Sequence, residues 1–308
     1  MSVPLPHARA SRDVDGIVLL DKPEGISSNA ALQRVRRAFC ARKAGHTGSL
    51  DPLASGMLPV CLGQATKASG MLLDADKTYR FRLALGRSTS TGDREGETLE
   101  SAPVPAFDAA AVGAAAARFV GESTQVPPMF SALKHDGRRL YRLARAGIEV
   151  ERPARPVRIE RLACQSLGPD WIDFEVTCSK GTYVRSLAED LARALGTAGH
   201  VASLRRLGLG PFEDARTWTL EEIEGAAGDP ARLDAMLIPV DEALPGMPAV
   251  QLGDEAQAWI LQGRPVAATG PGAMRVRIYG VGGRFLGVGR MSAEGARLAP
   301  ERIMVELP

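Results

Sequence analysis

A glycine-rich segment around one Asp-Pro step carries the residue types best suited to chemistry. Residues 45–56 read GHTGSLDPLASG and contain a single acid, Asp51. Glycine lets a ligand approach the backbone closely, and a carboxylate fixed on a rigid turn can act as nucleophile or base. Asp-Pro also commonly begins a turn. These residues alone therefore leave two interpretations open, a catalytic Asp51 and an aspartate that only shapes a turn.

Three further side chains are candidates, each with a simpler alternative. His46 stands alone, and its spacing to other residues does not indicate metal ligation. Tyr79 lies in an alternating segment, where an aromatic residue is usually part of the core. Arg185 falls in the first turn of an expected helix, where the helix dipole disfavours a cation, so it needs either a partner or simple exposure to solvent.

The periodicity of apolar residues predicts the elements that position these side chains. Ser27 and Ser28 offer N-caps to a helix whose apolar positions Leu32, Val35 and Phe39 share one face. Strands are expected at residues 17–20, 57–62, 79–85 and 171–178, and helices at residues 106–120 and 182–195. The segment around Asp51 is expected to be a loop between core elements.

The composition is that of a folded chain in a reducing compartment. The 308 residues are 45% hydrophobic and carry a formal net charge of only +2, so an RNA partner cannot be inferred from total charge. The four cysteines are widely spaced, which argues against a zinc site and a disulfide framework. The first sixteen residues lack the apolar segment of a signal peptide. We expect a cytoplasmic protein without a membrane span or a metal.

Two regions could bind nucleic acid. Between Lys134 and Arg158 the chain is rich in cations, which indicates either a solvated charged surface or an RNA-binding surface. From residue 246 onward, glycine-punctuated alternating segments predict a small β-rich domain after a short helix around residues 254–262.

Longer motifs reveal a family resemblance. The run GHTGSLDPLASGMLPVCLGQATK, residues 45–67, resembles the central motif of the tRNA pseudouridine synthase B (TruB) family almost letter for letter. The similarity continues in Asp21-Lys22-Pro23-x-Gly25-x-Ser27-Ser28, in Lys77-Thr78-Tyr79, in the segment from Gln125 to Lys134, and in residues 178–185, CSKGTYVR. These motifs span most of the first two-thirds of the chain.

The resemblance implies an isomerase that converts uridine 55 in the T loop of tRNA to pseudouridine without cofactor or metal. By motif position, its essential aspartate is Asp51. The carboxylate would either attack the sugar C1′ or assist a glycal-type intermediate, and the residues do not choose between these routes. Because the target uridine lies in a folded loop, the enzyme must flip it out of the stack. Assistance in tRNA folding is a further expected role.

The same resemblance assigns roles to the other candidates. Tyr79 would form an aromatic wall for the flipped base, Arg185 would pair with Asp51 and keep it charged, and His46 would support the opened T loop. Further contacts to the substrate are expected from Lys22, Lys134 and Tyr183.

The expected fold is α+β, with a mixed, mainly antiparallel sheet flanked by helices and a small β domain at the end. We expect a catalytic domain at residues 1–245 with a basic RNA-binding insertion at about residues 123–156, a PUA-type domain at residues 246–308, and a monomer that binds the T arm of tRNA. Two rival functions remain open, an RNA-binding protein that folds tRNA with a structural Asp51, and a hydrolase with an aspartate nucleophile.

Overall fold

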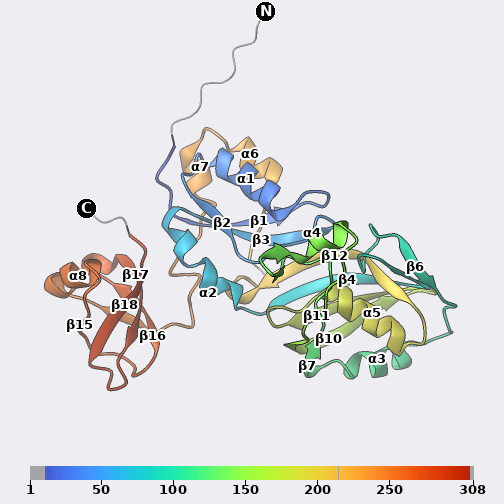
Figure 1. The fold of residues 1–308 in the computed structure, drawn as a ribbon. Helices are drawn as coiled ribbons and strands as arrows, with labels where there is room; N and C mark the ends of the chain where they lie inside the picture. The colour runs from blue at the N-terminus through green and yellow to red at the C-terminus, as the bar shows by residue number, and fades with distance from the viewer. Residues whose placement is uncertain (1–10, 214, 306–308) are drawn as a thin grey trace, which may run out of the picture.

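The structure, a computed structural model, describes residues 11–213 and 215–305. Residues 1–10, on which the expectation of a chain without a signal peptide partly rests, lie outside these ranges. Within them, every helix is too short or too polar to span a bilayer. The expected α+β fold is confirmed, with a large mixed sheet, flanking helices and a smaller sheet at the C-terminal end (Figure 1).

Up to residue 245 the elements are, in chain order, β1 Gly16–Lys22, α1 Ser28–Ala38, β2 Ala44–His46, β3 Ala54–Leu62, η1 Gly63–Lys67, α2 Ser69–Leu73, β4 Lys77–Leu85, β5 Arg87–Thr89, β6 Thr98–Ser101, α3 Ala109–Ala117, β7 Gly121–Gln125, β8 Lys134–His135, β9 Arg138–Arg139, α4 Leu140–Arg145, β10 Arg155–Leu167, β11 Trp171–Cys178, α5 Val184–Ala194, β12 Gly199–Leu209, η2 Gly210–Phe212, β13 Trp218–Thr219, α6 Leu220–Gly225 and α7 Pro230–Asp234. The C-terminal elements are β14 Ala249–Gln251, α8 Asp254–Leu261, β15 Val266–Ala267, β16 Arg275–Tyr279, η3 Val281–Gly283, β17 Phe285–Met291 and β18 Arg297–Ile303.

The large sheet has the strand order β13-β1-β3-β12-β4-β11-β10-β7, and β2 adds to β3. The pairs β1–β13 and β3–β12 are parallel, whereas the other pairs are antiparallel. Residues 204–206 in the middle of β12 pair in parallel with residues 54–56 at the beginning of β3. The segment that precedes β3, which carries Asp51, therefore lies over the centre of the sheet.

Burial on both faces explains why β1 reads as an unbroken apolar run. Val18 and Leu20 pack into a core with α1 and α6, whereas Ile17 and Leu19 pack into a second core on the opposite face. A third core joins α3 and α5 to strands β4, β10, β11 and β12. Alternating side chains of one strand point to opposite faces, so β1 is fixed between two helical layers.

The C-terminal sheet has the order β14-β16-β17-β18-β15 and its own apolar core. It also contacts the larger part of the protein, because Val288 and Met304 belong to the core that contains Ile17. The hydroxyl of Tyr279 donates to Asp241 Oδ2 at 2.9 Å across this boundary. The β-rich character expected for this region is confirmed, and its curled sheet is consistent with a PUA-like domain.

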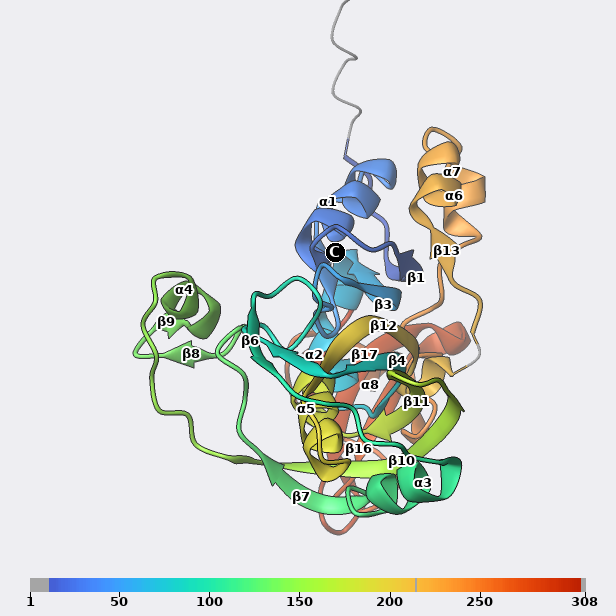
Figure 2. The same cartoon turned by 90° about the vertical axis from the view of Figure 1, so that its right-hand side faces the viewer.

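The structure shifts several element boundaries from the predicted ones and shows how the basic stretch is folded. The expected loop at residues 45–56 is confined to residues 47–53, because residues 44–46 and 54–62 form the paired strands β2 and β3. The helix expected at residues 182–195 begins at Val184, and Phe39 lies just beyond the end of α1. The basic stretch contains the short hairpin β8–β9 and helix α4, which Figure 2 shows standing to one side of the sheet.

Candidate active site

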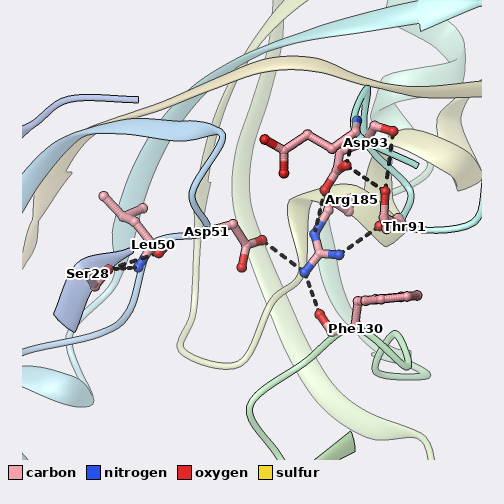
Figure 3. A network of polar contacts seen from close by, with 8 residues as sticks. Ser28, Leu50, Asp51, Thr91, Asp93, Phe130 and Arg185 are labelled. Carbon is pink, nitrogen blue, oxygen red and sulfur yellow. Dashed lines mark hydrogen bonds and ion pairs between the residues drawn. The ribbon is translucent and has the colours of Figure 1, made fainter. Parts of the chain in front are cut away.

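The loop that carries Asp51 is held by the segment between β1 and α1. The buried Ser28 Oγ accepts a hydrogen bond from Leu50 N at 2.7 Å and lies 2.9 Å from Leu50 O, to which it donates. Gly25 N donates to Pro52 O at 2.8 Å. Figure 3 shows Leu50 pinned to Ser28 immediately before Asp51. The Asp51 backbone is therefore fixed on both sides before any ligand arrives.

Arg185 at the start of α5 supplies the cation that faces Asp51. Its Nη2 lies 2.9 Å from Asp51 Oδ2, while Arg185 keeps only 6% of its side chain exposed and Asp51 keeps 43%. Nη1 and Nη2 also donate to Thr91 O at 2.7 Å and to Phe130 O at 2.8 Å. The ion pair implied by the family resemblance is thus present (Figure 3), and its carboxylate stays partly exposed to solvent.

A second, buried carboxylate completes this network. Asp93 Oδ2 lies 3.9 Å from Arg185 Nε, and Asp93 Oδ1 accepts from Thr91 Oγ1 at 2.6 Å and from Glu95 N at 3.1 Å. Asp93 is not among the site residues expected from the sequence. Its approach to Arg185 depends on the fold of residues 89–97 against α5, for which the sequence alone gives no distinct signal.

Asp51 lines an open cavity of about 600 Å³. Two aromatic side chains, Tyr79 from β4 and Tyr183 from the residue before α5, contribute to its wall. The backbone of Tyr183 is fixed by Gln125, whose Oε1 accepts from Tyr183 N at 2.7 Å and whose Nε2 donates to Tyr183 O at 3.1 Å. The volume suits a small ligand such as a single nucleoside.

Both phenols in this cavity are neutral at physiological pH. Burial raises the pKa of Tyr79, and the nearby charge of Arg206 opposes that rise. Burial likewise raises the pKa of Tyr183, and the nearby charge of Arg185 opposes that rise. Each hydroxyl can therefore donate a hydrogen bond to a ligand.

Lys22, by contrast, does not line the cavity. Its side chain is buried at the end of β1, and its Nζ donates to Pro23 O and Ile26 O at 2.8 Å and faces Pro52 O at 3.5 Å. Burial lowers the pKa of Lys22 to about 8, although the charges of Asp51 and Glu24 partly oppose this. Lys22 therefore faces the backbone of the Asp51 loop and lies outside the cavity.

His46 and Lys134 also lie outside the cavity that Asp51 lines. His46 is half-buried in β2, where burial and the charge of Arg206 lower its pKa. Lys134 is exposed on the β8–β9 hairpin, where it lines a separate hollow together with Arg138, Arg139 and Arg142. The structure therefore gathers Asp51, Tyr79, Tyr183 and Arg185, and the expected substrate contacts of Lys22, His46 and Lys134 stay predictions.

Arg206 is a cavity residue that the sequence analysis missed. It lies in β12, is 1% exposed, and lines the same cavity as Asp51. Nothing in the local sequence separates it from the neighbouring Arg205, which faces Asp21 on the surface. Within the described ranges, no three His, Cys, Asp or Glu side chains form a group that could hold a metal ion.

Comparison with known proteins supports one family along nearly the whole chain. Residues 36–184 match a model described as the TruB family pseudouridylate synthase N-terminal domain. Residues 185–245 match the tRNA pseudouridylate synthase B C-terminal domain, and residues 248–304 match a pseudouridine synthase II TruB C-terminal model.

Relatives that match this chain over nearly their full length carry the name of the same family. The chain is 52% identical over 299 residues to the tRNA pseudouridine synthase B of Ectopseudomonas mendocina (strain ymp), covering 96% of this chain and 97% of the relative. It is 50% identical over 306 residues to the protein of the same name from Sodalis glossinidius (strain morsitans), covering 97% and 98%.

Solved structures share the fold at lower identity. An archaeal box H/ACA sRNP Nop10-Cbf5 complex contains a chain with a TM-score of 0.70 and 23% identity, covering 94% of this chain and 86% of that one. An H/ACA RNP bound to a substrate RNA containing 2′-deoxyuridine gives a TM-score of 0.72 at 22% identity, covering 98% and 93%.

Fold, family models and relatives together define a pseudouridylate synthase, which is an isomerase. The chain belongs to the TruB family of these enzymes.

Proposed function

We propose that the enzyme isomerises uridine 55 in the T loop of tRNA to pseudouridine, with Asp51 as the essential carboxylate. The single observation that carries this proposal is the Asp51–Arg185 pair, in which a buried guanidinium holds one oxygen of a half-exposed carboxylate at 2.9 Å. Relatives at 50–52% identity named tRNA pseudouridine synthase B support tRNA as the substrate.

The reaction breaks the bond between C1′ and N1, turns the uracil, and joins C5 to C1′. Extruding the uridine from its loop costs a few kcal/mol of stacking, which contacts inside the cavity must offset. Tyr79 and Tyr183 offer aromatic surface for the base, and Asp51 lines the same cavity, where it would lie beside the sugar. Attack on C1′ and glycal formation both require this carboxylate beside the sugar.

The remaining parts of the chain would bind the rest of the T arm. We assign the catalytic domain to residues 1–245, an RNA-binding insertion to about residues 123–156, and a PUA-like domain to residues 246–308. The exposed cations of the β8–β9 hairpin and α4, and the separate apolar core of the C-terminal sheet, support this division. Lys22 would act from behind the Asp51 loop, and His46 and Lys134 would contact RNA outside the cavity.

The test uses an unmodified tRNA transcript and wild-type enzyme, with chemical mapping of pseudouridine along the whole chain. We expect one product at position 55, and none anywhere when that position is cytidine. Pseudouridine at other positions would contradict the assigned specificity. A wild-type enzyme that yields no pseudouridine but speeds tRNA folding would favour the RNA-folding role, and free uracil or a cleaved strand would indicate a hydrolase.

A further inference from the structure

Five cationic side chains line the cavity of Asp51, namely Lys77, Arg155, Lys180, Arg185 and Arg206. Three of them are buried and already bound within the protein. Arg185 faces Asp51 at 2.9 Å, and Lys77 and Arg206 donate to backbone carbonyls at 2.5–3.0 Å. These three cations hold the wall of the cavity together. Arg155 and Lys180 are exposed, so they can meet a ligand.

Arg155 is the first residue of β10 and lies close to one of the aromatic residues of the cavity. In the sheet register it stands opposite Gln125 of β7. The side chain of Gln125 binds the backbone N–H and C=O of Tyr183. No carboxylate of the described residues forms an ion pair with Arg155, whereas Arg152 and Arg158 on either side of it are paired. Its charge is therefore available to an anion at the open side of the cavity.

Lys180 belongs to the turn between β11 and α5, three residues before Tyr183. Its Nζ lies 2.7 Å from Asp74 Oδ1, and the two side chains are 63% and 65% exposed. An ion pair this exposed contributes little to stability, because water and salt screen it. Lys180 can therefore exchange the carboxylate of Asp74 for another anion at small cost.

A uridine that enters this cavity brings anions with it. It remains joined to the RNA chain through one phosphodiester on its 5′ side and one on its 3′ side, and each carries a negative charge. Burying these charges without partners would be costly, so they stay at the opening while the base and sugar go inside. The carboxylate of Asp51 in the same cavity repels them. Cations at the opening offset both effects, and arginine suits phosphate because its planar fork can bind two oxygens.

We propose that Arg155 and Lys180 bind the phosphodiester groups that flank the target uridine, and that Lys180 leaves Asp74 as it does so. This inference rests on the proposed function and adds to it the residues that recognise the backbone of the flipped nucleotide. The site is separate from the hollow beside the β8–β9 hairpin and α4, which other cations line.

The test measures the affinity of wild type and of an Arg155→Gln, Lys180→Gln double variant for a synthetic T-arm stem-loop. Either flanking linkage is replaced by a neutral methylphosphonate. Every RNA compared, including the charged parent, carries a 2′-O-methyl group on the nucleotide before that linkage. For wild type, we expect each replacement to weaken binding by about five- to tenfold. The double variant should bind the charged RNA about tenfold or more weakly, and each replacement should then cost about twofold or less.

Arg158→Gln is the matched control, because Arg158 lies three residues further along β10, pairs with Asp76 at 2.7 Å and is outside the cavity wall. It should keep the affinity of wild type within about twofold and the full loss from each methylphosphonate. Asp74→Asn removes the competing carboxylate, so it should tighten binding by about two- to threefold.

Equal methylphosphonate losses in wild type and the double variant at both linkages would overturn the inference. Weaker binding by Asp74→Asn would show that Asp74 does not compete with the RNA for Lys180, and would overturn that part of it. Failure of the wild-type enzyme to form pseudouridine in the unsubstituted T arm would instead refute the proposed function.

Discussion

At the scale of single residues, the site depends on an arginine whose hydrogen bonds are made before substrate arrives. The guanidinium of Arg185 binds Thr91 O and Phe130 O as well as Asp51 Oδ2, and Asp93 lies beside its Nε. Lysine could not replace it, because a single ammonium cannot reach acceptors in a planar fork. A preorganised cation of this kind stabilises charge on the carboxylate without reorganisation during the reaction.

A pH dependence of stability follows from the buried Lys22. Its pKa is lowered from 10.5 to about 8, so the unfolded chain binds more protons than the folded protein between these values. Below pH 8 both states are protonated and the burial penalty is complete, and the penalty decreases as the pH rises toward 10.5. We expect the free energy of unfolding of wild type, relative to Lys22→Met, to increase by about 2 kcal/mol from pH 7 to pH 9.5.

Urea unfolding of both variants at the two pH values measures this difference. A relative stability that stays constant with pH would show that Lys22 titrates in the folded protein as it does in the unfolded chain, and one that falls would show that folding raises the pKa of Lys22.

At the scale of elements, the turn between β1 and α1 supports the loop that carries Asp51. Ser28 binds both backbone groups of Leu50, Gly25 binds Pro52, and the ammonium of Lys22 faces the same proline carbonyl. The motif from Asp21 to Ser28 is thus explained by its contacts with a segment more than twenty residues away. It determines where the Asp51 backbone lies.

Two adjacent serines test this explanation. Ser28→Ala leaves the buried N–H and C=O of Leu50 without their partner, so we expect a loss of about 2 kcal/mol in stability and a roughly tenfold slower single turnover. Ser27 caps α1 by accepting from Ala30 N at 3.1 Å, away from the loop. Ser27→Ala should cost about 1 kcal/mol and leave the rate unchanged. Equal rates for the two variants at saturating RNA would contradict the proposed support.

Periodicity predicted the elements better than it predicted their contacts. Strand β11 matches its expected range, and Ser27 caps α1 as expected, because both signals are local. The pairing of β2 with β3 was missed because glycine content indicated a loop, whereas strand pairing decided the conformation. Asp93 and Arg206 were missed as site residues because their positions depend on register and packing between distant segments. The pairing of Arg185 with Asp51 was foreseen only through the family resemblance.

At the scale of the whole molecule, charge is distributed so that a nearly neutral chain presents a basic arm. The net charge is +2, yet the β8–β9 hairpin and α4 carry exposed cations beside a hollow of about 460 Å³. This arm lies to one side of the sheet (Figure 2), which is why we expect it to contact RNA without disturbing the core. Affinity for RNA and chemistry at Asp51 are therefore expected to be separable.

A salt titration tests that separation. Replacing Arg138 and Arg142 by alanine should weaken tRNA binding and reduce the slope of log K against log salt by about one to two, because fewer counterions are released. The rate at saturating tRNA should not change. The matched control replaces Arg80 and Arg82, which pair with Glu175 and Asp173 on the sheet. An unchanged slope in the Arg138 and Arg142 variant would contradict the role of the arm.

The most direct test of the central claim is the single-turnover rate of Asp51→Asn on a saturating unmodified tRNA, measured with its binding affinity. The asparagine keeps the size of the side chain but cannot act as a nucleophile or base. We predict that binding stays within about threefold of wild type while pseudouridine formation falls by at least about 1,000-fold. Pseudouridine formation within about tenfold of wild type would contradict the assignment of Asp51 as the catalytic carboxylate.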